Sequence, residues 1–354
     1  MQIEKGRIHA PEISSEWLNS PPLTLRELRG RVVLIDFWDY TCVNCIRTLP
    51  YLVEWDRRYR DLGLTIIGAH APEFQFARTV DFVREAVARF QIRYPVVLDN
   101  HYRIWQAFAN KYWPAKYLID KDGYVRYFQF GEGDYSATEL TIQELLREIQ
   151  PALSLPAPLL PFREADRPGA VCYRVTPELY LGYDRGKIGN PSGFRNGSLA
   201  HYELPETRCP DVFFVAGFWT SQAEFMETAG TPQNPSRLLL AYTAKEVNLV
   251  MVPHNVEPIR VEIYQDGQPV LSEDAGEDLV RIDGRTWVEV TVPRMYRLIN
   301  NQRFDVSAGG AAARELELSC GAAGLGCYAF TFVSCALDSA APGASGRASE
   351  RMNG

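Results

Sequence analysis

Long hydrophobic runs are missing from this 354-residue sequence. Its richest apolar stretches, residues 31–38 and 211–219, have the length of a β-strand and contain charged residues. A transmembrane helix needs about 20 predominantly apolar residues, so no membrane span is expected. The first twelve residues, MQIEKGRIHAPE, also lack the apolar core of a secretory signal. If Met1 is the true start, the expected location is the cytoplasm, although a fragment of a mature exported protein would begin in the same way.

An excess of positive charge is also missing. The chain has 37 Lys and Arg residues against 44 Asp and Glu residues, which gives a net charge of −7. Because a nucleic acid backbone is polyanionic, an acidic chain is a poor partner for it. Nucleic acid is therefore not expected among the partners.

Cysteine is scarce, at seven residues. Small secreted domains held together by disulfides are much richer in cysteine, so that class is excluded, and an odd number leaves at least one thiol unpaired. Cys42 and Cys45 form the only CxxC pattern. Because no histidine and no second cysteine pair stands at zinc-ligand spacing, we expect neither a metal site nor a cofactor.

Secondary-structure patterns divide the chain into two modules. Strand-like and helix-like stretches alternate in residues 1–150, which predicts an α/β fold. Five prolines in residues 151–168 predict an extended linker. Short alternating runs fill residues 169–335 and predict an all-β sandwich. The small, polar residues 336–354 predict a disordered tail.

In the first module the expected elements follow from hydrophobic periodicity and turn residues. The expected strands are residues 31–38, 64–69, 95–98, 115–120 and 124–130, and the expected helices are residues 42–61, 74–90, 101–108 and 136–149.

The clearest chemical signal is the segment Cys42-Val43-Asn44-Cys45, which lies where a buried strand leads into a helix. Free N–H groups and the helix dipole favour the Cys42 thiolate, while Cys45 lies one turn inside the helix. Cys42 can form a mixed disulfide with a substrate, and Cys45 can then displace that substrate. A zinc knuckle and two neighbouring core cysteines are the alternative interpretations. The strand-to-helix context favours redox chemistry over both.

Residues 1–150 resemble a thioredoxin-fold domain of the redoxin, or TlpA, type. As in thioredoxins, Asp36 lies six positions before Cys42, and Pro50 lies eight positions after it. Trp113-Pro114 precedes the expected strand at residues 115–120, where the family has its cis-proline loop. The resemblance implies a thioredoxin fold with a redox-active disulfide and a cis bond before Pro114.

The resemblance also implies roles for residues around the two cysteines. Asp36 would accept a proton from Cys45, although a strand-end aspartate can also cap local backbone. Trp38 and Trp113 would flank the disulfide as apolar walls for a peptide or small ligand, although either can equally be core packing. The lysine that thioredoxins place near the buried aspartate has no evident equivalent in residues 64–69.

More narrowly, the run FWDYTCVNCIRTLPYL and the following β-module resemble the extracytoplasmic, soluble part of DipZ-type proteins. That resemblance implies a jelly-roll-like sandwich similar to a carbohydrate-binding module, which makes carbohydrate a candidate ligand. A sandwich that shields the first module or forms a dimer face is the alternative. The candidate ligand-binding aromatic residues, chosen by residue type, are Tyr183, Trp219, Tyr242, Trp287 and Tyr296. Cys320 and Cys327 flank a hairpin-like connection and either pair or remain free thiols.

Together these features predict a thiol-disulfide oxidoreductase that acts on protein or small-molecule disulfides and dithiols, with a thiol electron donor or acceptor as its second partner. The alternative is a non-catalytic binding or scaffold protein whose CxxC motif is a redox sensor. Peroxidase chemistry is not expected, because Asp39 stands three positions before Cys42 where redoxin peroxidases have Thr or Ser.

Overall fold

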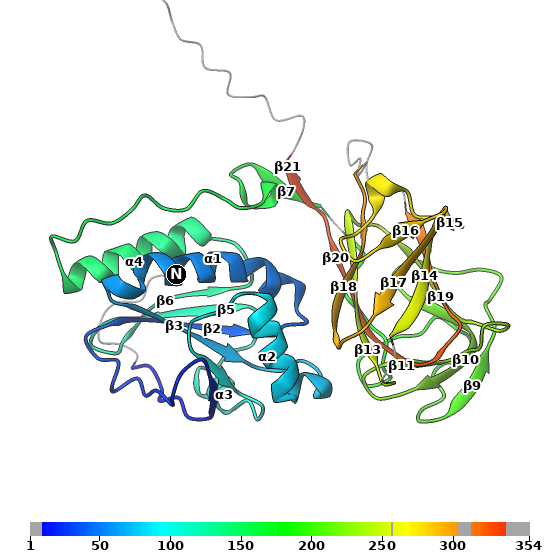
Figure 1. The fold of residues 1–354 in the computed structure, drawn as a ribbon, viewed down its shortest axis with the longest axis horizontal. Coiled ribbons are helices and arrows are strands. Elements are labelled where there is room, and N and C mark those ends of the chain that lie inside the picture. Colours follow the sequence, from blue (N-terminus) through cyan, green and yellow to red (C-terminus); the bar gives the residue numbers. More distant parts are fainter. Residues whose placement is uncertain (1–8, 174, 256–257, 303–312, 338–354) are drawn as a thin grey trace, which may run out of the picture.

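The computed structural model describes residues 9–173, 175–255, 258–302 and 313–337. Figure 1 shows a layered α/β module beside an all-β module, in the order that the sequence predicts. None of the helices in these ranges has the length and hydropathy that a membrane span requires. The predicted tail falls almost entirely on residues 338–354, which lie outside the described residues.

The first module is built on a mixed six-stranded sheet. Its strands, in spatial order, are β1 (Glu16–Leu18), β4 (Val96–Leu98), β3 (Leu64–His70), β2 (Val32–Trp38), β5 (Ala115–Ile119) and β6 (Val125–Phe130). Strand β2 runs parallel to β3 and antiparallel to β5. All seven residues of β2 are buried because layers cover both of its faces, which explains its continuous apolar run.

Helices cover both faces of this sheet (Figure 1). They are α1 (Val43–Tyr59), α2 (Val80–Arg89), α3 (Arg103–Ala107) and α4 (Tyr135–Ile149), with the short 3₁₀ turns η1 (Arg60–Leu62) and η2 (Gln75–Arg78). Leu34 and Trp38 of β2 pack in the cluster that contains residues of α1 and α4. Ile35 and Phe37 pack on the opposite face with α3. Since side chains alternate along a strand, Asp36 faces α1.

The predicted strands and helices of this module agree with the structure except at residues 74–90, and the edge strand β1 was not predicted. The sequence predicts one helix there, whereas the structure has η2 followed by α2. Thr79 separates them because its backbone is extended, with φ −72° and ψ 116°. The periodicity of the two pieces is nearly continuous, so it does not reveal the break.

The second module is an all-β structure of antiparallel strands. One layer contains β12 (Ser236–Tyr242), β14 (Ile259–Gln265), β15 (Gln268–Pro269), β16 (Val280–Ile282), β17 (Arg285–Val290) and β19 (Arg314–Cys320), and the short turn η4 (Ser272–Asp274) follows β15 in the chain. The other contains β8 (Leu179–Tyr180), β9 (Leu199–Tyr202), β11 (Met226–Ala229), β13 (Glu246–Pro253), β18 (Arg294–Asn300) and β20 (Ala323–Val333). A single apolar core lies between the layers.

Strand β10 (Phe213–Ser221) belongs to both layers of the second module. Its first half pairs with β12, and its second half pairs with β9 and β11. The change occurs at Gly217, whose φ of +80° lies in the left-handed region. A side chain there would also meet the carbonyl oxygen of Pro235, so glycine suits this corner.

The linker lies against the first module. Residues 151–163 have no regular structure, as their prolines predict, and η3 (Glu164–Asp166) follows. Leu155 and Leu159 pack against the core under α1 and α4. The backbone N–H of Leu159 donates to Glu139 of α4 at 2.7 Å. The segment is therefore extended and also docked.

A disulfide joins Cys172 to Cys335 across 163 residues of sequence. The two cysteines are directly paired in the small ribbon formed by β7 (Ala170–Cys172) and β21 (Cys335–Leu337). The sequence allowed Cys320 and Cys327 either to pair or to remain free, and in the structure both are buried free thiols. Spacing along the chain gives no hint of the pair that forms, because its partners belong to opposite ends of the β-module.

Candidate active site

Cys42 and Cys45 lie at the amino end of α1, where the chain leaves β2. Cys42 is the N-cap residue, with extended backbone, and its Sγ accepts a hydrogen bond from the Cys45 N–H at 3.3 Å. Cys42 is partly exposed, whereas Cys45 is buried. Burial, together with the interaction with Cys42, raises the pKa of Cys45 well above its usual range. The exposed sulfur can therefore meet a substrate, and the buried sulfur keeps its proton until a base removes it.

Asp36 is a buried acid on the α1 side of β2, behind the cysteines. Neither of its carboxylate oxygens has a hydrogen-bond partner among the described residues. Burial raises the pKa of Asp36 to about 7, against an opposing attraction from Lys116. Asp36 also interacts electrostatically with Cys45. An acid with a pKa near neutrality can both accept and release a proton at ordinary pH.

Lys116 lies beside the site and was not predicted from the sequence. It stands directly opposite Asp36 in the β2–β5 pairing and is fully buried. Its Nζ donates to the Gly131 carbonyl at 3.3 Å, and burial lowers the pKa of its ammonium group. The resemblance places a lysine on residues 64–69, which lie in β3, whereas in the structure the lysine comes from β5 on the other side of β2. A charged residue inside the apolar run of residues 115–119 was the available signal.

The Trp113–Pro114 peptide bond is cis. The loop that contains it enters β5, and the Pro114 carbonyl accepts a hydrogen bond from the Gly131 N–H at 2.8 Å. Trp113 is partly buried, and its indole N–H donates to the Ala71 carbonyl at 3.0 Å. Trp38, in contrast, is 0% exposed and packs on His70 in the core. The expected apolar wall at Trp38 is therefore core packing, and only Trp113 remains available to a ligand.

A buried carboxylate fixes the turn between β2 and α1. Asp39 Oδ1 accepts hydrogen bonds from the backbone N–H and the hydroxyl of Thr41, at 2.7 and 2.8 Å. Its Oδ2 accepts the backbone N–H of Glu73 at 2.5 Å. Burial raises the pKa of Asp39, and these three hydrogen bonds oppose the rise. The sequence did not predict this role of Asp39, because it depends on a backbone N–H 34 residues away.

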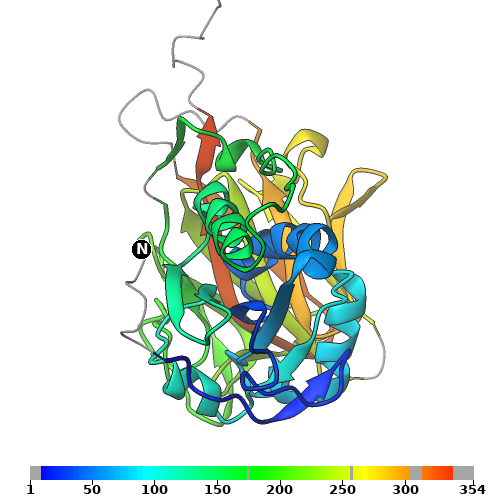
Figure 2. The same ribbon diagram turned by 90° about the vertical axis from the view of Figure 1, so that its left-hand side faces the viewer.

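The β-module packs against the helix that carries the cysteines. Val43 and Ile46 of α1 share a buried cluster with Val250, Met295 and Ala329 from the second module. Figure 2, seen from the side of the first module, shows α1 and α4 in front of the strands of the β-module. The interface therefore begins at the residue that follows Cys42.

An ion pair extends this contact. Arg47 Nη2 lies 2.7 Å from Glu246 Oε2 of the β-module, and Arg47 Nη1 lies 3.4 Å from Glu132 of the first. The Arg47 side chain is almost completely buried, so its two carboxylate partners compensate for the lost hydration of its charge.

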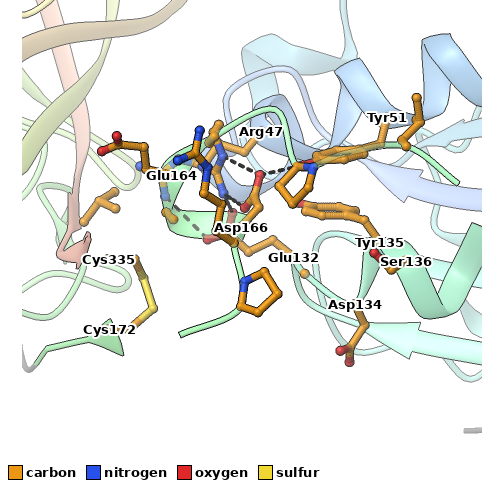
Figure 3. Close-up of a pocket in the computed structure, with 18 of the residues that line it drawn as sticks. Arg47, Tyr51, Glu132, Asp134, Tyr135, Ser136, Glu164, Asp166, Cys172 and Cys335 are labelled. Carbon is orange, nitrogen blue, oxygen red and sulfur yellow. Dashed lines mark hydrogen bonds and ion pairs between the residues drawn. A yellow bond between two sulfur atoms is a disulfide. The ribbon is translucent and has the colours of Figure 1, made fainter. Parts of the chain in front are cut away.

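A cavity of about 700 Å³ lies where the two modules and the linker meet. Figure 3 shows Arg47 and Tyr51 on one side of it and the Cys172–Cys335 disulfide on another. Tyr51 donates to Asp166 of η3 at 2.8 Å. Neither Cys42 nor Cys45 lines this cavity, so it is separate from the cysteine pair.

The aromatic residues proposed for carbohydrate occupy several environments. Trp219, Tyr242 and Tyr296 are buried in the core of the β-module, which corrects their selection as ligand contacts. Trp287 is partly buried and lies under the Arg260 guanidinium at 3.6 Å, and Tyr183 is also partly buried. Within the described ranges, no cluster of three or more His, Cys, Asp or Glu residues could hold a metal ion.

Comparisons with known proteins match both modules. Residues 8–128 match the AhpC/TSA family, and residues 176–332 match the family described as "Thioredoxin like C-terminal domain". Protein DipZ of Mycobacterium bovis is 38% identical over 268 residues, which cover 73% of this chain and 37% of DipZ. The chain thus corresponds to somewhat more than a third of the length of that relative.

A second relative matches the first module over nearly its whole length. The thiol-disulfide oxidoreductase YkuV of Bacillus subtilis is 31% identical over 149 residues, which cover 41% of this chain and 99% of YkuV. Among solved structures, a thiol-disulfide isomerase from Corynebacterium glutamicum is 25% identical, covers 39% of this chain and 96% of its own, and has a TM-score of 0.36. The chain belongs to the thioredoxin-like thiol-disulfide oxidoreductases, with a redoxin domain followed by a thioredoxin-like C-terminal domain.

Proposed function

We propose that the Cys42/Cys45 pair exchanges disulfides with cysteine-containing polypeptides and small disulfides, and that the β-module forms one wall of the site. The observation that carries the proposal is the asymmetry of the two sulfurs at the start of α1. Cys42 is partly exposed and accepts the Cys45 N–H, while Cys45 is buried in front of Asp36 and Lys116.

The exchange proceeds in two steps. In the first, the Cys42 thiolate attacks one sulfur of the substrate disulfide, that S–S bond breaks, and the leaving thiolate takes a proton from solvent. In the second, Asp36 removes the proton of Cys45, and the Cys45 thiolate attacks Cys42 Sγ. The S–S bond between Cys42 and the substrate breaks, the released substrate thiolate takes a proton from solvent, and a Cys42–Cys45 disulfide remains. A thiol donor then restores the reduced pair, and the same steps run in reverse oxidise a dithiol substrate.

The surface near the cis-proline loop supports a polypeptide substrate. Tyr112 and Phe130 are 53% and 40% exposed, and their rings lie 5.3 Å apart. Phe130 ends β6 and precedes Gly131, which bonds to Pro114. Such exposed aromatic rings can hold an apolar side chain of an extended chain whose cysteine reaches Cys42.

Insulin reduction by dithiothreitol tests the proposal, using the full chain, Cys42→Ser and Cys209→Ser. Cys209 is an exposed free cysteine of the β-module, so its variant is a matched control. We expect catalysis by the unmodified chain and by Cys209→Ser, and only the background rate with Cys42→Ser. If the unmodified chain does no better than Cys42→Ser, the motif does not catalyse this exchange, and a sensor role replaces the proposal.

A further inference from the structure

The Cys42 turn is connected to the β-module by a short series of hydrogen bonds. The backbone N–H of Cys42 donates to the Asp39 carbonyl at 3.3 Å. The Asp39 carboxylate accepts hydrogen bonds from the Thr41 backbone N–H on one oxygen and from the Glu73 backbone N–H on the other. Asp39 thus joins the turn after β2 to the turn after β3, and Glu73 is the outer end of this connection.

The Glu73 side chain leaves the first module and contacts the second. Its Oε1 lies 2.7 Å from the Tyr180 hydroxyl and 3.0 Å from Arg185 Nη2. The Arg185 guanidinium lies 3.5 Å from the centre of the Tyr180 ring. This cation–π contact holds the two side chains together beside Glu73. The Tyr180 hydroxyl is also 2.7 Å from Glu178, and Arg185 gives Glu73 a second donor that does not depend on that hydroxyl.

A second contact lies on the same turn. The Gln75 backbone N–H donates to Glu224 of the β-module at 3.0 Å, and Phe74 packs on Tyr328 with ring centroids 5.2 Å apart. Residues 73–75 are therefore held by the β-module through their side chains and backbone together. Movement of that module would change the position of the Glu73 N–H that Asp39 accepts.

We infer that the docked β-module positions the Cys42 turn through Glu73 and Asp39, which makes Tyr180, Glu73 and Asp39 positioning residues for thiol-disulfide exchange. The inference rests on the proposed function, because it concerns the rate at which Cys42 attacks. None of the three residues takes part in bond making. They act because the attacking sulfur must align with the substrate S–S bond, and small displacements reduce the rate of such reactions.

The test uses the reduced full chain with Cys209→Ser as background and Ellman's reagent as the disulfide. Attack by Cys42 releases one thionitrobenzoate, and resolution by Cys45 releases a second, so stopped-flow absorbance separates the two steps. Peptide mapping of the early product verifies that Cys42 carries the label. We expect Tyr180→Phe and Glu73→Gln each to slow the first step about 5-fold, and Asp39→Asn to slow it about 30-fold.

Two matched controls separate positioning from general stability. Tyr264→Phe removes a β-module hydroxyl that donates to Glu262, two residues earlier on β14. Asp120→Asn alters a buried carboxylate that accepts two backbone N–H groups at the far end of β5. Both controls are expected to retain the rate of the first step, even where their melting temperatures fall as far as those of the test variants.

The double variant Tyr180→Phe/Asp39→Asn gives the sharpest result. If the residues act through one connection, the double variant is no slower than Asp39→Asn alone. A double variant slowed by the product of the two single reductions would overturn the inference while leaving the proposed function intact. A Tyr180→Phe rate equal to that of the background chain would do the same. A background chain whose Cys42 is not labelled would instead overturn the proposed function. Should Asp39→Asn fail to fold, Tyr180→Phe and Glu73→Gln provide the same comparison.

Discussion

At the residue scale, a buried acid and a buried base face each other across two strands behind the cysteine pair. Asp36 and Lys116 are both fully buried beside Cys45. Their charges stabilise each other, yet burial dominates and brings the pKa of Asp36 to about 7. Asp36 is therefore ionised above neutrality and protonated below it, which sets the pH range in which it can receive the Cys45 proton.

The resolution step should follow the ionisation of Asp36. We expect the second release of thionitrobenzoate to slow as the pH falls below about 7, because protonated Asp36 cannot accept a proton. Asp36→Asn should slow this step about 100-fold and remove the inflection. Stopped-flow measurements of this rate at about ten pH values between roughly 5 and 9 test the prediction.

Lys116→Met provides the complementary result. Because Lys116 lowers the pKa of Asp36, its removal should move the inflection to higher pH. An inflection near pH 7 that persists in Asp36→Asn would assign the titration to another group.

The buried position of Cys45 leads to a trapping prediction. Cys45→Ser retains the exposed sulfur of Cys42 and removes the sulfur that resolves its mixed disulfides. We expect this variant to accumulate mixed disulfides with polypeptides that contain disulfide bonds. Non-reducing electrophoresis and mass spectrometry would detect them. Cys42→Ser should trap little, because Cys45 is buried. Equal trapping by the two variants would reverse the assigned roles.

At the scale of elements, the first module could be predicted from its sequence because its elements are locally encoded. The apolar run of β2 and the turn at residues 121–123 are patterns within a few residues. What could not be predicted are contacts between distant segments. Lys116 reaches Asp36 only through the register of β5 against β2, and Val43 meets Val250 only because the β-module docks.

The β7–β21 ribbon is another element that local patterns do not reveal. It pairs only three residues on each strand, and a two-stranded ribbon of this length is marginal by itself. Its disulfide closes a loop of 163 residues and restricts the unfolded chain. We expect Cys172→Ser to lower the free energy of unfolding of the β-module by about 2–5 kcal/mol.

Urea titration of the β-module's own tryptophan signal would measure that change. Cys320→Ser, which alters a buried free thiol of the same module, is the comparison that separates loss of the cross-link from loss of packing. A Cys172→Ser variant as stable as the unmodified chain would show that the ribbon contributes little to folding.

At the scale of the whole molecule, the β-module packs against the helix that carries Cys42 and Cys45. Val43 and Ile46 become exposed when the β-module is removed, and fully burying an apolar side chain of this size contributes roughly 1.5–3 kcal/mol. A fragment comprising residues 1–168 keeps the docked linker. We expect it to fold with a lower melting temperature and to slow the Cys42 step at least as much as Tyr180→Phe does.

The fragment experiment also has a clear opposite outcome. Calorimetry would give the melting temperature, and Ellman's reagent would give the rate of Cys42 attack. A fragment that reacts as fast as the full chain would show that the β-module is only attached to the redox domain. The same fragment with Asp39→Asn distinguishes loss of the β-module from damage to the turn itself.

The Cys172–Cys335 bond also determines how the molecule would carry tension. Force applied to the two ends of the chain would be transmitted from the linker to the C-terminal segment through this disulfide. The reason is that the bond joins β7 directly to β21. The strands between them would experience no force while it is intact. In a single-molecule stretching experiment, reduction would release 163 residues as additional contour length, roughly 550 Å at full extension. The β-module is thus mechanically protected in its oxidised form and becomes extensible when a thiol opens the bond.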